Sequence, residues 1–249
     1  MQKTVLITGA DHGLGLSLVK VFLANNYTVF AGVYKLSEGS QIQNEQSIHD
    51  ILDTENLHHV EMDVSDTVSV EKAAERVGKI TQSLDIVINN AGILCADSFN
   101  DKNISILEKL DVDGMMNVYN VNALGAVRVA NAFTPLLLKS EEKLLINISS
   151  EAGSIADCGA CDWHGYRMSK AAMNTAGAVI QNEYVKHGGR VWQLHPGWMQ
   201  TYMHGKKCEQ ATYSSYFSAE HIYKLIQNAD SQKSDELIFM DILGTPLPW

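Results

Sequence analysis

Tyr166 and Lys170 are four residues apart, so a helix through this segment would place a phenol and an ammonium on one face within one turn. A phenol has an unperturbed pKa of about 10, so at neutral pH it can donate a proton to an oxygen that gains negative charge. A nearby ammonium stabilises the phenolate and so assists the reverse proton transfer. Exposed Tyr/Lys pairs are also common on helices, so this pair indicates chemistry only together with other motifs.

A glycine-rich segment near the N-terminus could bind phosphate. Thr8-Gly9-Ala10-Asp11-His12-Gly13-Leu14-Gly15 follows a strand-like run, and a helix is expected to begin inside it. Glycines permit a tight turn and a close approach of the backbone to a pyrophosphate, whose charge is favoured by the N–H groups of a helix N-terminus. The position between a strand and a helix favours a dinucleotide-binding loop over a glycine-rich turn without a ligand.

Seven short aliphatic runs alternate with longer amphipathic stretches. Leu14, Leu18 and Phe22, for example, form an apolar stripe on one helical face between the first two runs. This alternation predicts the α/β class: a single-domain, doubly wound Rossmann fold over residues 1–249, with helices on both faces of a seven-stranded parallel sheet. The expected strands are Thr4–Ile7, Tyr27–Ala31, Leu57–Met62, Asp85–Asn89, Leu144–Ser149, Val191–His195 and Glu236–Met240.

Two segments are less regular. Residues 36–56 are polar and only weakly periodic, so we expect a loosely held helix there. Residues 198–217 are rich in large apolar side chains, which suits a mobile substrate lid, although a pair of surface helices is the alternative. The large side chains are Trp198, Tyr202, Met203, Tyr213, Tyr216 and Phe217.

The composition limits the partners of the protein. The chain has 249 residues, of which 45% are hydrophobic, and carries 29 acidic and 19 basic residues for a net charge of −10. This charge argues against nucleic acid and anionic lipid as partners. No apolar run approaches the roughly 18 residues that span a bilayer, and strand-like sequence begins at Thr4, so we expect a cytoplasmic protein without a membrane segment.

The glycine spacing Gly-x-x-x-Gly-x-Gly resembles that of the short-chain dehydrogenase/reductase family, and further motifs extend the resemblance in order. Asn89-Asn90-Ala91-Gly92 follows the fourth strand, Asn122 lies in a long helix, and Ser149-Ser150 ends the fifth strand. Tyr166-x-x-x-Lys170 and Pro196-Gly197 follow. The segment His195-Pro196-Gly197-Trp198, the later Thr201 and the ending Gly244-Thr245-Pro246-Leu247-Pro248-Trp249 are similar to the C-factor and sniffer-like carbonyl reductase branch.

The resemblance implies hydride transfer between a nicotinamide and a small, mainly apolar aldehyde, ketone or quinone, or the corresponding alcohol. Tyr166 would be the general acid/base, with Lys170 beside it; Ser150 would orient the carbonyl, and Asn122 would hold a water linked to the lysine. Ser149 and Asn120 are the rivals for the last two roles. The alternative function is an NAD(P)-binding signalling or regulatory protein with little turnover, because C-factor relatives are associated with cell-to-cell signalling.

The choice between NAD and NADP depends on the second strand. In dinucleotide folds an acid at its end binds the ribose 2′-hydroxyl of NAD. Here Gly32-Val33-Tyr34-Lys35 offers no carboxylate before Glu38, and Lys35 would attract a 2′-phosphate, as could His12. We therefore expect NADP(H) to be preferred, with NAD(H) possible.

The remaining cofactor contacts come from the resemblance. Asp63 would contact the adenine, although it could instead cap the next helix. The full set of expected cofactor-binding residues is Gly9, His12, Gly13, Leu14, Gly15, Tyr34, Lys35, Asp63, Val64, Asn90, Ala91, Gly92, Tyr166, Lys170, Pro196, Gly197, Met199 and Thr201. Family members often pair through the two long helices, so a homodimer or homotetramer is possible.

One loop departs from the family pattern. Tyr166 lies sixteen positions after Ser150, where about thirteen are usual, and the longer loop contains Cys158-Gly159-Ala160-Cys161 and His164. Structural zinc sites need four ligands and this segment offers three. We expect two reduced cysteines and no metal, with a redox role for the pair as the alternative.

Overall fold

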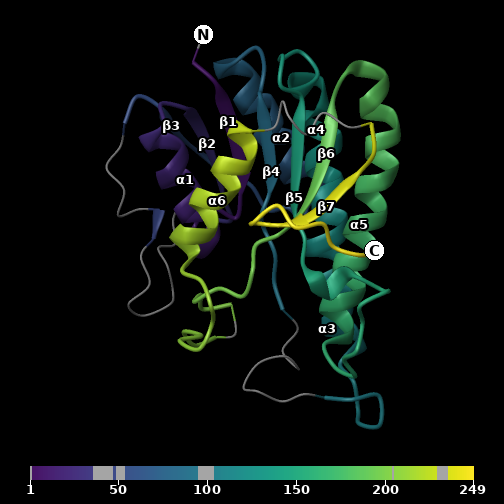
Figure 1. Ribbon diagram of the computed structural model, residues 1–249. Helices are drawn as coiled ribbons and strands as arrows, with labels where there is room; N and C mark the ends of the chain where they lie inside the picture. The colour runs from purple at the N-terminus through teal and green to yellow at the C-terminus, as the bar shows by residue number, and fades with distance from the viewer. Residues whose placement is uncertain (1, 36–46, 49–53, 95–103, 204, 229–234) are drawn as a thin grey trace.

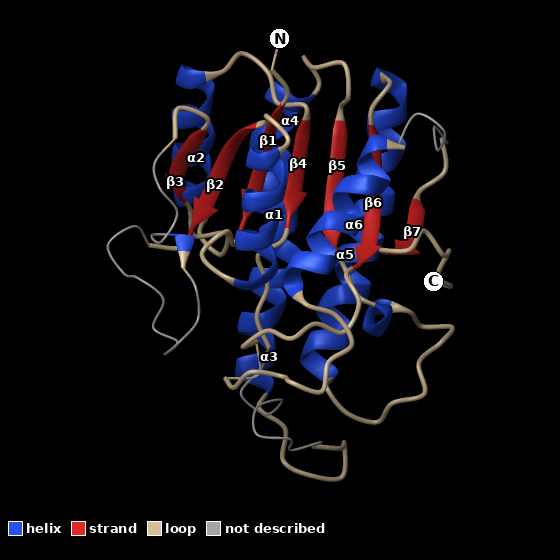
Figure 2. Ribbon diagram, turned by 60° about the vertical axis from the view of Figure 1, so that its left-hand side comes forward, coloured by secondary structure: helices blue, strands red, loops and turns tan. Residues whose placement is uncertain are grey.

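The computed structural model describes residues 2–35, 47–48, 54–94, 104–203, 205–228 and 235–249. Its seven strands form one parallel sheet in the order β3-β2-β1-β4-β5-β6-β7 (Figures 1 and 2). The strands are β1 (Thr4–Thr8), β2 (Thr28–Val33), β3 (Leu57–Glu61), β4 (Ile86–Asn89), β5 (Leu144–Ile148), β6 (Arg190–His195) and β7 (Ile238–Asp241). All seven expected strands are confirmed.

Helices flank the sheet on both faces. They are α1 (Gly13–Ala24), α2 (Thr67–Ile80), α3 (Val112–Tyr119), α4 (Gly125–Leu137), α5 (His164–Tyr184) and α6 (Ser215–Gln227), with a π-helical turn at Asn120–Leu124 and short 3₁₀ turns at Glu151–Gly153 and Val185–His187. Figure 2 shows α1 and α6 side by side on the near face. Among the described residues, no helix is long and apolar enough to span a membrane.

Strand alternation divides the core into two layers. Val5 and Ile7 of β1 pack in one cluster with Leu18 and Phe22 of α1, whereas Leu6 packs in the other with residues of α2 and α4. The apolar stripe expected on the first helix is thus confirmed as its core-facing side. Most of residues 36–56 lie outside the described residues, so the helix expected there has no counterpart to compare.

The order of the strands determines where a ligand can bind. The chain crosses from β2 and β3 on one side of β1 to β4 on the other, so β1 and β4 flank a switch point. In open α/β sheets, ligands bind outside the carboxyl ends of the strands at such a point. The parallel strands run toward the lower edge of the sheet in Figure 2, where α3 also lies.

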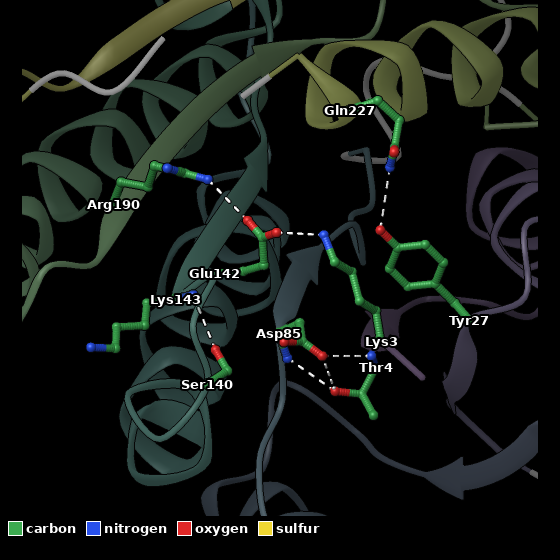
Figure 3. Close-up of polar contacts among 9 residues, drawn as sticks. All are labelled: Lys3, Thr4, Tyr27, Asp85, Ser140, Glu142, Lys143, Arg190 and Gln227. Atoms are coloured by element: carbon green, nitrogen blue, oxygen red, sulfur yellow. Dashed lines mark hydrogen bonds and ion pairs between the residues drawn. The ribbon is translucent and has the colours of Figure 1, made fainter. Parts of the chain in front are cut away.

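The opposite edge of the sheet is held by polar contacts (Figure 3). The Asp85 carboxylate accepts hydrogen bonds from the backbone N–H of Thr4 at 2.7 Å and from its hydroxyl at 2.9 Å. Glu142, just before β5, pairs with Lys3 before β1 and with Arg190 of β6. These contacts tie together the amino ends of strands that are far apart in the sequence.

Asp85→Ala is expected to lower the free energy of unfolding by about 1–3 kcal/mol, because it removes the acceptor of a partly buried backbone N–H. Urea unfolding measures the effect. Asp85→Asn keeps an acceptor oxygen, so it should lower the free energy of unfolding by less than Asp85→Ala does. Equal stability of Asp85→Ala and the parent would contradict this interpretation.

Candidate active site

The glycine loop has positive φ values and close backbone contacts that favour glycine. Gly9 and Gly13 have positive φ values of 61° and 57°, and a Cβ on Gly15 would lie 2.0 Å from the Gly9 carbonyl oxygen. Helix α1 begins at Gly13, and the side chain of its N-cap residue, His12, makes no capping hydrogen bond. The positive end of the helix therefore meets the switch point without a side-chain cap, which fits an anionic ligand.

The loop after β4 is bonded directly to the glycine loop. The Asn90 side-chain amide donates to the carbonyls of Thr8 and Gly9 at 2.9 and 3.0 Å, and the Thr8 hydroxyl accepts from the N–H groups of Asn90 and Ala91. A Cβ on Gly9 would lie 2.8 Å from the Ala91 Cα. The expected contacts Asn90 and Ala91 thus adjoin the glycine loop and are bonded to Thr8, which sequence reasoning did not assign to the site.

At the end of β2, the expected residues Tyr34 and Lys35 are both exposed, and the Lys35 ammonium lies 5.4 Å from the centre of the Tyr34 ring. The backbone N–H of Tyr34 donates to both carboxylate oxygens of Asp11, at 3.2 and 3.3 Å. A carboxylate therefore lies beside this strand end although the strand itself has none. Glu38 lies outside the described residues.

Asp63 follows β3 but does not cap the next helix. Its Oδ1 accepts from the N–H and hydroxyl of Ser65, at 2.8 and 2.7 Å, whereas Asp66 caps α2 by accepting from Val68 N. The capping alternative is therefore wrong. Val64 is buried against α4, with its Cγ2 3.0 Å from where a Cβ on Gly125 would lie.

Ser150 and Tyr166 meet in front of the carboxyl end of β5. Burial raises the pKa of Tyr166 to about 12, and the interaction of its hydroxyl with the side chain of Ser150 lowers it. The rival Ser149 is buried, and its hydroxyl donates to Asn174 at 2.6 Å. Ser150, not Ser149, is thus the serine that interacts with Tyr166. Because its pKa is raised, the phenol of Tyr166 stays protonated at neutral pH.

Lys170 lies one turn after Tyr166 on α5, as the spacing predicts. It is only 3% exposed, its ammonium donates to the Ile148 carbonyl at 2.7 Å, and it lies 5.6 Å from the centre of the Tyr166 ring. Burial lowers the pKa of Lys170 to about 8. A cation whose charge is sensitive to pH is therefore positioned beside the phenol.

Asn122 lies in the π-helical turn between α3 and α4. Its side chain accepts from Ile93 N at 2.8 Å and donates to Ile93 O at 2.9 Å and to the Ser169 hydroxyl at 3.0 Å. The rival Asn120 instead bonds Arg128. Asn122 therefore joins the loop after β4 to the helix that carries Lys170, and π turns of this kind are frequent at functional sites.

Gly92 lies close to Asn122, Lys170 and Met203. A Cβ added there would lie 3.4 Å from the Asn122 Oδ1 and 3.8 Å from both the Lys170 Nζ and the Met203 Cε. The expected cofactor residue Gly92 thus lies next to two expected catalytic residues. It also adjoins the irregular segment after β6, through Met203.

The segment after β6 folds back on itself beside α6 (Figure 1, the yellow-green loop). Gly197 has a positive φ of 78°, and a Cβ there would lie 2.5 Å from the Tyr213 ring. Met199 pairs with Tyr213 in an isolated bridge, and Thr201 accepts from Cys208 N at its carbonyl. Within the described part of 198–217 only Ser215–Phe217 are helical, so the alternative of two surface helices is wrong.

The long loop before α5 is anchored by the C-terminus. Ala156 N donates to the carbonyl of Trp249 at 2.8 Å, and the Trp163 ring packs edge-to-face on Tyr166 at 6.0 Å. Cys158 and Cys161 are exposed free thiols. Across the described ranges, no group of three His, Cys, Asp or Glu side chains could hold a metal.

This combination of fold and site defines a class of protein. The family model for short chain dehydrogenases matches residues 3–212, and the chain belongs to the short-chain dehydrogenase/reductase family. The resemblance that the glycine loop and the Tyr166/Lys170 pair indicated is confirmed. The protein is therefore an oxidoreductase of this family.

The relatives and solved structures that it resembles include carbonyl reductases. An uncharacterized oxidoreductase of Schizosaccharomyces pombe is 34% identical over 201 residues, 80% of this chain and 75% of the relative. The NADPH-bound carbonyl reductase from chicken fatty liver is 31% identical with a TM-score of 0.84, covering 100% and 99% of the two chains. The carbonyl reductase Sniffer of Drosophila melanogaster is 26% identical with a TM-score of 0.84, covering 100% of both chains.

Proposed function

We propose that the protein is an NADP(H)-dependent reductase that interconverts a carbonyl, in an aldehyde, ketone or quinone, and an alcohol by hydride transfer. The observation that carries this proposal is the group formed by Ser150, Tyr166 and Lys170 at the carboxyl edge of the sheet. A protonated phenol, a hydroxyl beside it and a buried ammonium can together bind and protonate a carbonyl oxygen.

The cofactor would occupy the edge between the glycine loop and Gly92. In this proposal the pyrophosphate binds Gly9, Gly13–Gly15 and the N-terminus of α1, and the 2′-phosphate meets Lys35 and His12. Asp63 would contact the adenine, Asn90–Gly92 would line the adenosine ribose, and Val64 is a further proposed cofactor contact. Pro196, Gly197, Met199 and Thr201 hold the nicotinamide amide. When bound, NADPH supplies the hydride, and an NADPH-bound relative supports this choice of cofactor.

The side chains of the chain itself position and protonate the substrate. The hydroxyls of Ser150 and Tyr166 bind the carbonyl oxygen, and Tyr166 donates its proton from Oη as negative charge develops. The ammonium of Lys170 stabilises the phenolate that remains. Asn122 holds the loop of Gly92 and Ile93 in place, and we propose that it also holds the water that links Lys170 to solvent.

The segment 198–217 is proposed as the lid over the substrate. Support comes from Met203, which lies near Gly92 and Lys170, and from the stacked rings of Tyr213 and Phe217, 4.9 Å apart. These apolar groups suit a small, mainly apolar substrate. In this proposal all 249 residues form one catalytic domain.

Consumption of NADPH with a panel of aldehydes, 1,2-diketones and quinones tests the proposed activity. We expect turnover of at least part of the panel, with the alcohol as product. A protein that binds NADPH but consumes none of it beyond the background rate would support the alternative, a binding protein without turnover.

Lys35→Met is expected to raise the KM for NADPH by about tenfold and to leave the KM for NADH unchanged, because it removes a cation that attracts the 2′-phosphate. Steady-state kinetics with both cofactors measure this difference. Lys79→Met, in the last turn of α2, is the matched control and should change neither constant. Equal effects of Lys35→Met on both cofactors would contradict the assignment.

A further inference from the structure

The carboxylate of Asp11 occupies the end of β2, although the sequence places it in the glycine loop, 23 positions before Tyr34. Both of its oxygens accept from Tyr34 N, at 3.2 and 3.3 Å. The backbone on both sides of Asp11 is fixed as well, since Ala10 N donates to Gly32 O at 2.9 Å and Ile48 N donates to Asp11 O at 2.9 Å. The carboxylate is therefore held at this strand end by the fold.

This position has a defined chemical meaning in a dinucleotide fold. A carboxylate at the end of the second strand accepts a hydrogen bond from a ribose 2′-hydroxyl and repels a 2′-phosphate. The two oxygens of a carboxylate offer about four acceptor positions, and both oxygens of Asp11 lie within 3.3 Å of Tyr34 N at this strand end. Lys35, which would attract the phosphate, follows Tyr34 directly.

We propose that Asp11 is a specificity-determining residue for the cofactor. Its carboxylate repels the 2′-phosphate of NADP(H), so that the site accepts NAD(H) as well as NADP(H). This inference rests on the proposed dinucleotide site and adds to it a residue that opposes Lys35. The acid expected at the end of β2 comes from the glycine loop, which folds beside this strand. The opposite charges of Asp11 and Lys35 together set the selectivity between NADP(H) and NAD(H).

Asp11→Asn tests the proposal, because asparagine has the same shape and keeps an oxygen for the Tyr34 N–H but carries no charge. Calorimetric titration of the whole protein with adenosine 2′,5′-bisphosphate and with 5′-AMP measures the contribution of the 2′-phosphate without any catalysis. We expect the ratio of the two affinities to shift toward the 2′-phosphate by about tenfold in the variant. The ratio of kcat/KM for NADPH and NADH with one carbonyl should shift in the same direction.

Asp66→Asn is the matched control, because it removes the same charge from the N-cap of α2, where asparagine caps as well as aspartate. Its affinity ratio should change by less than about twofold. An unchanged ratio in Asp11→Asn, with both nucleotides bound by the parent, would overturn the role of Asp11 and leave the proposed function intact. A parent that binds neither nucleotide would overturn the dinucleotide site itself, and the inference with it.

Discussion

We expect Tyr166→Phe to lower kcat/KM for carbonyl reduction by about a thousandfold and to leave the Kd for NADPH within about twofold of the parent value. The phenylalanine ring keeps the edge-to-face contact with Trp163 and loses only the hydroxyl, which interacts with the side chain of Ser150. The serine hydroxyl then has no phenol beside it, and the developing alkoxide has no positioned acid. Steady-state rates and a fluorescence titration of NADPH separate the two quantities.

Tyr184→Phe is the control for this substitution. Tyr184 is the last residue of α5 and is buried, and its hydroxyl forms a hydrogen bond with Thr134 at the opposite end of this helix from Tyr166. Activity should change by less than about twofold, whatever the cost in stability. If Tyr166→Phe kept more than about a tenth of the activity, the general-acid role of Tyr166 would be wrong.

The second large effect concerns Lys170 and pH. Because burial lowers the pKa of Lys170 to about 8, its positive charge is present below this pH and is lost as the pH rises through it. The pKa of Tyr166 is raised to about 12, so the phenol remains protonated over the same range. We therefore expect kcat/KM for reduction to fall above pH 8 through loss of the ammonium, since a phenol without a neighbouring cation is a weaker acid.

Lys170→Met is expected to lower kcat/KM by about a hundredfold and to abolish the decline near pH 8. The profile of kcat/KM against pH at constant ionic strength measures both effects. Lys186→Met removes an exposed lysine that pairs with Glu183 and should retain the decline. A decline near pH 8 that persists in Lys170→Met would assign it to another group and contradict the role of Lys170.

Local patterns in the sequence were sufficient to predict the sheet. Parallel strands buried on both faces are continuous apolar runs, and a run such as Val5–Ile7 is bounded by the polar residues Thr4 and Thr8. The Tyr166/Lys170 pair was likewise predictable, because four-residue spacing places both side chains on one helical face. These features depend only on residues that are neighbours in the sequence.

Choices that depend on distant partners could not be made from the sequence pattern alone. The Ser149 hydroxyl bonds Asn174, 25 positions away, and the Asn120 side chain bonds Arg128; these bonds favour Ser150 and Asn122 for the proposed roles. Asp11 was missed because its place at the end of β2 arises only when the glycine loop folds beside that strand. Each case turns on a hydrogen bond between segments that the fold brings together.

The central claim is that a carbonyl held by Ser150 and Tyr166 receives a hydride from a bound nicotinamide. NADPH carrying deuterium at the transferable C4 position, incubated with a carbonyl from the reactive panel, tests this claim most directly by mass spectrometry of the product. We predict an alcohol that contains the deuterium in the parent and almost no alcohol with Tyr166→Phe. An alcohol without deuterium, or equal labelled product from both proteins, would contradict the account.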